Sequence, residues 1–142
     1  MSYLLDTCLI SEVVKKTPAK SVLAWLEQQD EQGLFLSVLT LGELQKGISK
    51  LSETAKKKKL TAWVNQDLRQ RFQGRVLDIT EEVAMIWGQL QGEAEKRGEK
   101  PPAIDSVIAA TALVHNLTIV SRNGVDMEKC GASVLDVWGT SP

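Results

Sequence analysis

Short apolar runs alternate with longer amphipathic segments along this chain. Five runs have the length and the apolar or β-branched content of strands: 3–5, 34–38, 75–79, 117–121 and 134–137. The first run is apolar on both faces, which is typical of a central strand in a parallel sheet, and the third is expected at an edge. Because strands alternate with helical segments, the pattern predicts an α/β fold with a mainly parallel sheet.

The amphipathic segments between these runs predict the helices. A short helix is expected near residues 9–14, and Thr17-Pro18 predicts the next start, with Thr17 as the cap and Pro18 in the first turn. Thr40 opens a further helix, at the spacing of a capping box with Glu43. Residues 52–73 read as a long polar helix, and Thr80 is expected to cap the one after it.

The stretch from Pro102 to Ala112 predicts the helix around which the chain is organised. Its inward face is expected to hold the apolar residues that recur at helical spacing, Ile104, Val107, Ile108 and Thr111. Its alanines are small enough for close packing on a sheet, and Asn116 resembles a helix stop. Asp105 then falls in or just before the first turn, where unpaired N–H groups favour a carboxylate. A simple N-terminal cap is one interpretation of Asp105.

Composition places the chain among ordinary globular proteins and predicts one domain over residues 1–142. It is 43% hydrophobic and 25% charged. No apolar run approaches the roughly 20 residues that span a bilayer, and no secretory signal precedes the first strand, so the cytoplasm is the expected location. Cys8 and Cys130 stand far apart without a CxxC pair, which argues against a disulfide framework or a zinc site. His115, the only histidine, cannot build a histidine-rich metal site.

The net charge of −1 argues against tight, non-specific binding to long nucleic acid, which usually needs a basic excess. It does not exclude an enzyme that holds a short stretch of backbone through metal ions. The run Lys56–Lys59 has two interpretations: a solvated helix face, which is the commoner meaning, or a basic patch for RNA.

Four acidic residues fall near the predicted strand ends. Asp6 ends the first strand, Glu43 follows the second, and Asp126 lies beyond the fourth, so these three fit the carboxyl edge where open α/β sheets bind ligands. Asp105 fits this edge less simply, because a helix that leads into a strand is expected to start at the opposite edge, and periodicity leaves its position open. Glu43 has a second interpretation as the capping-box partner of Thr40.

Carboxylates without histidine or cysteine suggest a particular chemistry. They are hard oxygen ligands, which suit Mg²⁺ or Mn²⁺ rather than zinc. Like charges that crowd together also need a cation to stay ionised. Two such ions can activate a water and stabilise the leaving oxygen of a phosphodiester.

At these residues the chain resembles the PIN-domain family, and more narrowly the VapC-type toxins of bacterial toxin–antitoxin pairs. The matching motifs occur in the family's order from residue 4 to residue 127: Leu5-Asp6-Thr7 with Ile10-Ser11-Glu12, Leu41-Gly42-Glu43-Leu44 with Gly47, Asp105 with Ile108-Ala109-Ala110-Thr111-Ala112, and Ser121-Arg122-Asn123. The resemblance implies a three-layer α/β/α sandwich with a parallel sheet of four to five strands. It also implies a Mg²⁺- or Mn²⁺-dependent endoribonuclease that is held inactive by a small antitoxin, with catalytic roles for Asp6, Glu43 and Asp105.

The chain departs from the family pattern at two positions. Cys8 stands where the family often has Asn, and Asn123 where it often has Asp. We expect Asp126 to supply the missing charge as a metal ligand if residues 123–126 form a helical turn; the alternative is that it caps a short turn. Residues expected to position substrate or water are Thr7, Ser121 and Asn123.

Other functions remain open at this point. A PIN-like module that binds RNA or protein without cutting is the main alternative, favoured by Asn123 alone. An aspartyl-phosphate phosphatase would need a second Asp where Cys8 stands, and a dinucleotide fold would need a GxGxxG after the first strand. The resemblance also implies a homodimer, for which Trp25, Trp63 and Trp87 offer apolar surface.

Overall fold

A parallel sheet built from the five predicted strands lies at the centre of the fold. The computed structural model describes residues 1–139, and among these the strand order is β3-β2-β1-β4-β5 with every adjacent pair parallel. The strands are β1 (Tyr3–Leu5), β2 (Leu34–Ser37), β3 (Val76–Leu77), β4 (Thr118–Val120) and β5 (Val134–Leu135). β1 is central and β3 lies at an edge, which confirms both predictions.

Helices cover both faces of this sheet. Before β3 the chain forms α1 (Thr7–Val13), α2 (Lys20–Glu27), the short 3-10 turn η1 (Glu31–Gly33), α3 (Val38–Ser49), α4 (Ala55–Ala62), the π-helical η2 (Trp63–Leu68) and α5 (Arg69–Arg71). After β3 come α6 (Glu81–Lys96), α7 (Ala103–His115) and α8 (Val125–Lys129). Thr80 caps α6 as predicted, and Asn116 ends α7 in the left-handed conformation.

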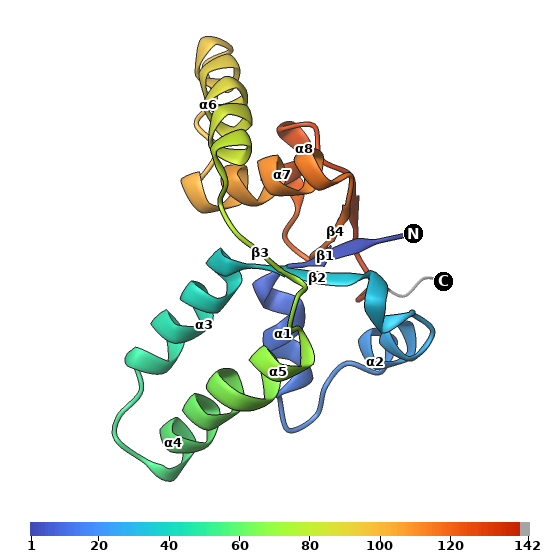
Figure 1. The fold of residues 1–142 in the computed structure, drawn as a ribbon, viewed down its shortest axis with the longest axis vertical. Coiled ribbons are helices and arrows are strands. Elements are labelled where there is room, and N and C mark those ends of the chain that lie inside the picture. The colour runs from blue at the N-terminus through green and yellow to red at the C-terminus, as the bar shows by residue number, and fades with distance from the viewer. Residues whose placement is uncertain (140–142) are drawn as a thin grey trace.

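Alternate strand residues supply two separate cores, one on each face of the sheet. Leu5, Leu36 and Val120 pack toward α1, α2 and η2, whereas Leu4 and Ile119 pack toward α7 and α8. Figure 1 shows the two groups of helices on opposite sides of the sheet, with α6 standing away from it on the side of α7. This arrangement confirms the predicted three-layer α/β/α architecture.

The direction of α7 corrects an expectation about Asp105. His115 and Asn116, at the end of α7, lie beside Met1 and Ser2, at the start of β1. A helix that connects parallel strands runs back against them, so it begins at their carboxyl edge and ends at their amino edge. The expectation that α7 starts at the opposite edge is therefore wrong.

Several predicted helix boundaries are also wrong. α2 begins at Lys20 rather than at Pro18, because the Glu12 carboxylate accepts a hydrogen bond from the Ala19 N–H and holds the chain extended there. α3 begins one turn earlier than expected, since the Ser37 hydroxyl caps it by accepting from the Leu39 N–H. The capping box of Thr40 with Glu43 therefore does not form.

The inward face of α7 differs in part from the prediction. Ile108 and Thr111 are buried together with the alanines, but Ile104 is 40% exposed. Ile108, Ala109 and Ala112 form the part of this face that packs with Leu4 and Ile119 of the sheet. Among residues 1–139, no helix is long and apolar enough to cross a bilayer.

Candidate active site

Asp6 is held rigidly where β1 ends, at the point where the strand order reverses between β2 and β4. Its N–H donates to the Val120 carbonyl at 3.0 Å. One carboxylate oxygen accepts from the Thr7 N–H at 2.9 Å and the other from the Ser121 hydroxyl at 2.8 Å. The side chain is nearly buried, with 9% of the residue exposed. The topological switch point of the sheet thus presents a fixed carboxylate.

Glu43 joins Asp6 through the threonine between them. The Thr7 hydroxyl donates to Glu43 Oε1 at 2.5 Å, and it lies 3.5 Å from the buried hydroxyl of Thr40. Glu43 is therefore oriented by α1 rather than by a cap on its own helix. Thr7, predicted as a positioning residue, orients Glu43 through its hydroxyl and Asp6 through its backbone N–H.

Asp105 completes the cluster from the other face of the sheet. Burial raises the pKa of its carboxyl, and the negative charges of Asp6, Asp126 and Glu43 raise it further. Four carboxylates from four segments of the chain therefore act on one another at one edge of the sheet. The residue that caps α7 is Pro102, so the interpretation of Asp105 as a simple N-terminal cap is wrong.

The first turn of α7 is fixed by a bond from α6. The Trp87 indole N–H donates to the Ser106 hydroxyl at 2.9 Å, and that hydroxyl donates to the Ala103 carbonyl at 3.0 Å. Ser106 is fully buried beside Asp105. This pair of bonds anchors the turn that carries the Asp105 carboxylate.

Asp126 lies in the first turn of α8, whose cap is Gly124, so Asp126 is not the N-cap of that helix. α8 begins only at Val125, so residues 123–126 do not form the helical turn that would place Asn123 and Asp126 on one face. Asn123 instead precedes the helix and donates its backbone N–H to the Ser121 hydroxyl at 3.0 Å. Ser121 thus links the Asn123 loop to Asp6.

Cys8, which stands where the family often has Asn, borders the site and is partly buried. Its Sγ lies 3.8 Å from Asp6 Oδ2 and 3.5 Å from Ser121 Oγ. Burial raises the pKa of this thiol, so it stays protonated and neutral beside the carboxylate. Cys130 is buried in the core below α7.

Glu12 is a functional candidate that residue-level reasoning missed. It is 4% exposed, and its carboxylate accepts from Lys15 Nζ, the Ala19 N–H and the Trp138 indole N–H, each at 3.0 Å. Arg122, next to Ser121, lies 3.5 Å from the same carboxylate and stacks over the Trp138 ring. The sequence signal was present, because Glu12 is part of a family motif, but its partners are remote in the chain.

The donor chemistry of this cluster fits a hard divalent cation. Asp6, Glu43, Asp105 and Asp126 offer oxygen only, and their mutual repulsion creates the negative field that a cation would neutralise. In the part of the chain that the structure describes, no three Asp, Glu, His or Cys side chains converge closely enough to bind one ion as they stand. The four carboxylates are close enough for their charges to act on one another, but they do not form a complete coordination sphere.

Fold, strand order and acidic edge together define a PIN domain. The sequence model of that domain matches residues 3–131. This chain belongs to the PIN-domain family, and the resemblance noted from the motifs is confirmed.

The chain is similar over nearly its whole length to named toxins. Toxin FitB of Neisseria gonorrhoeae is 35% identical over 135 residues, which cover 95% of this chain and 97% of the relative. VapC ribonuclease Y4jK of Sinorhizobium fredii is 28% identical over 134 residues, covering 94% and 96%. The solved structure of FitAB bound to an IR36 DNA fragment contains a chain with a TM-score of 0.91 and 32% identity, with 99% of this chain and 98% of that chain covered.

The Glu12 contacts predict a pH-dependent contribution to stability. The Trp138 indole first, then Lys15 and the Ala19 N–H, lower the pKa of Glu12 from about 4.5 to about 2. A carboxyl with a lowered folded-state pKa stabilises the fold fully above its unfolded pKa and loses that contribution as the pH falls toward the folded value. We expect Glu12→Gln to lower the melting temperature at pH 7, and the gap to wild type to close between about pH 4.5 and pH 2.

Circular dichroism melts over this pH range measure the effect. Glu53→Gln is the matched control, because Glu53 lies in the exposed segment before α4 and forms a surface ion pair with Lys57. A gap that stays constant between neutral pH and about pH 3 would contradict the assignment.

Proposed function

We propose that residues 1–142 form one domain that acts as an endoribonuclease toxin, hydrolysing RNA phosphodiester bonds and neutralised by a cognate antitoxin. The carrying observation is that the negative charges of Asp6, Asp126 and Glu43 all act on the buried carboxyl of Asp105 and raise its pKa. The names of the similar proteins, a toxin and a VapC ribonuclease, support the same function. The clustered carboxylates disfavour the alternative of a module that binds RNA or protein without cutting.

Asp6, Glu43 and Asp105, with Asp126 beside them, are the residues that would hold Mg²⁺ or Mn²⁺. When bound, such an ion neutralises phosphate charge and lowers the pKa of a coordinated water. Ser121 and the Thr7 N–H fix both oxygens of Asp6, and the Thr7 hydroxyl orients Glu43. Asn123, next in the chain to Arg122, has a neutral amide to orient water or the scissile phosphate.

Asp105→Asn tests the catalytic assignment. The change keeps the shape but removes the charge, so we expect RNA cleavage in Mg²⁺ or Mn²⁺ to fall by a factor on the order of 10² or more. The fold should survive, and the metal-free protein should melt at a higher temperature because repulsion within the cluster is relieved. Glu128→Gln, a change to an exposed acid on α8, is the control with full activity.

Gel assays with end-mapped RNA, using protein freed of any partner, measure this loss. Full activity of Asp105→Asn would overturn the assignment. Tight RNA binding by wild-type protein without cleavage in either metal would favour the non-cutting module instead.

The fourth acidic position has its own test in a metal titration. We propose that Asp126 supplies the charge that Asn123 lacks, directly or through a water, since Asp126 acts on Asp105 more strongly than Glu43 does. Asp126→Asn should raise the metal concentration for half-maximal cleavage, and Asn123→Asp should lower it. If Asp126→Asn shifts only the melting temperature, the site has three carboxylates.

We also propose a homodimer and an antitoxin that covers the acidic cluster with an arginine or lysine. Trp25 and Trp87 give little support for the dimer, because Trp25 packs on Tyr3 and Trp87 bonds Ser106. Exposed Met85 and Val125, at 70% and 62%, offer apolar surface instead.

The dimer and the antitoxin have separate tests. Light scattering at micromolar concentration should show a dimer, and a monomer would contradict that proposal. Saturating antitoxin should abolish cleavage, and unchanged cleavage would contradict the proposal of neutralisation.

A further inference from the structure

The loop that follows β4 restrains one oxygen of the Asp6 carboxylate. Ser121 donates its hydroxyl hydrogen to Asp6 Oδ2 at 2.8 Å and accepts the Asn123 N–H at 3.0 Å. Because this hydroxyl has a single hydrogen, the Cys8 thiol is the donor in its 3.5 Å contact with Ser121 Oγ. Arg122 donates its backbone N–H to Cys8 Sγ at 3.5 Å. The position of this loop therefore decides how Asp6 is restrained on its Oδ2 side.

The Arg122 side chain links this loop to α1 and to the C-terminal segment. Its guanidinium lies over the Trp138 ring, 4.9 Å from the ring centre, and 3.5 Å from the Glu12 carboxylate. The Trp138 indole N–H donates to the same carboxylate at 3.0 Å. Each of these three side chains thus contacts the other two, and we call them the Glu12–Arg122–Trp138 cluster.

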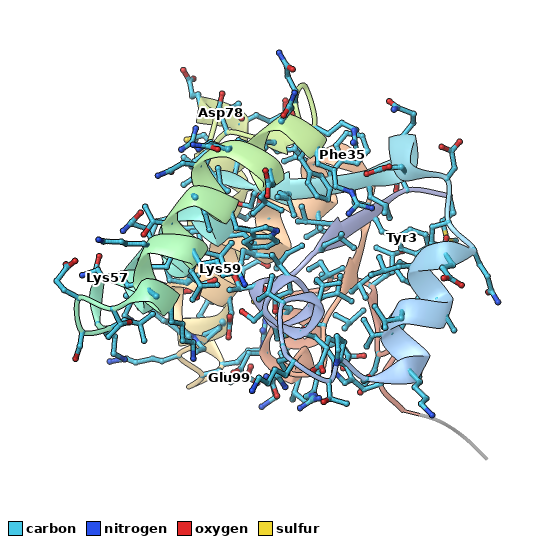
Figure 2. All side chains as sticks on the ribbon, turned by 90° about the horizontal axis from the view of Figure 1, so that it is seen from below. Tyr3, Phe35, Lys57, Lys59, Asp78 and Glu99 are labelled. Atoms are coloured by element: carbon cyan, nitrogen blue, oxygen red, sulfur yellow. The ribbon has the colours of Figure 1, made fainter. Side chains whose placement is uncertain are left out.

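Contacts with several segments hold Trp138 in place. Its N–H accepts no alternative partner in the turn, because it donates to the Asp136 carboxylate at 2.9 Å, and the Ser21 hydroxyl of α2 donates to its carbonyl at 3.4 Å. The neighbouring Val137 is buried in the core. Figure 2 shows the end of the described chain passing beside α2, with α1 next to it. The indole is therefore a fixed surface on which the half-exposed Arg122 packs.

The backbone of the loop is held separately, by β5. The Ser121 N–H donates to the Leu135 carbonyl at 3.1 Å. Gly124 lies so close to Val134 that a Cβ atom there would overlap the valine side chain. β5 thus supports both ends of the loop, whereas the Arg122 side chain between them connects the loop to the second turn of α1. Loss of that connection should loosen the loop against α1 without unfolding the sheet.

We propose that Glu12 and Trp138 are positioning residues of the acidic site: they hold Arg122, and through it they keep Ser121 where it restrains Asp6. The consequence for RNA cleavage rests on the proposed function, but the geometry itself needs neither metal nor RNA. The role is distinct from the contribution of Glu12 to overall stability, because it concerns one loop and not the whole fold.

Two substitutions of one residue test the proposal. Trp138→Leu removes both the ring under Arg122 and the indole N–H, whereas Trp138→Phe keeps a ring. Trp25→Leu is the matched control, because Trp25 packs against the same core but contacts Tyr3 at the start of β1. Alkylation of the metal-free protein by iodoacetamide, followed by mass spectrometry of the peptides that contain Cys8 and Cys130, measures the two thiols separately. Melting temperatures check that each variant folds.

The reaction of Cys8 reports how closely the loop covers α1. We expect Trp138→Leu to raise the ratio of the Cys8 rate to the Cys130 rate about fivefold or more, and Trp138→Phe to raise it less than about twofold. Cys130 is buried in the core, so its rate corrects for a loss of overall stability. Trp25→Leu should lower the melting temperature without changing the ratio. An unchanged ratio in Trp138→Leu, or an equal rise in Trp25→Leu, would overturn the proposal.

The kinetics of RNA cleavage separate positioning from direct contact with RNA. Trp138→Leu should lower kcat about tenfold and change KM less than about twofold, because a displaced Asp6 affects the transition state more than RNA binding. Trp138→Phe should recover most of this loss. If KM rises in Trp138→Leu while kcat stays constant, Arg122 contacts the RNA directly and the positioning proposal is wrong.

The two readouts also separate this inference from the proposed function. A selective rise of the Cys8 rate, in a protein that never cleaves RNA with metal, supports the hold on the loop and refutes the nuclease. Normal cleavage by Trp138→Leu, with an unchanged Cys8 rate, supports the nuclease and refutes the positioning role.

Discussion

The repulsion among four carboxylates at one edge of the sheet is the constraint on which the rest of the site depends. Burial and the neighbouring charges raise the pKa of Asp105, and hydrogen bonds from outside the cluster orient two of its other members. Asp6 is restrained by the Thr7 N–H and the Ser121 hydroxyl, and Glu43 by the Thr7 hydroxyl. Repulsion among these carboxylates opposes folding. The same concentration of negative charge also makes this edge of the sheet suitable for a cation.

Helices on the two faces of the sheet position different members of the acidic cluster. α1 and α3 place Thr7 and Glu43 from one side, while α7 brings Asp105 from the other, anchored by the Trp87–Ser106 bond. The strand order, with β1 between β2 and β4, lets both faces reach Asp6. Glu12 stabilises the surroundings of the cluster, because it connects α1 to Arg122 in the loop that follows Ser121. Backbone topology thus sets the distances, and buried hydrogen bonds set the orientations.

The sequence predicted the fold and the identity of the acidic residues better than their arrangement. Strand positions follow from local apolar runs, α6 begins directly after its cap Thr80, and α7 ends at Asn116. The start of α2 could not be found this way, because Glu12 captures the Ala19 N–H from seven residues away. The edge at which Asp105 lies depended on the direction of a crossover helix, a property of the whole sheet. The contacts of Glu12 with Trp138 and Arg122 join segments more than a hundred residues apart, beyond any periodicity argument.

The nearly neutral total charge conceals an uneven distribution of charge. Four carboxylates act on one another at the carboxyl edge of the sheet, whereas Lys15 and Lys56 line a groove that Thr7 and Glu43 also line. A site made only of carboxylates attracts cations but repels the phosphates of a nucleic acid. The field at the site is therefore set by where the fold places each charge, and the net charge of the chain does not report it.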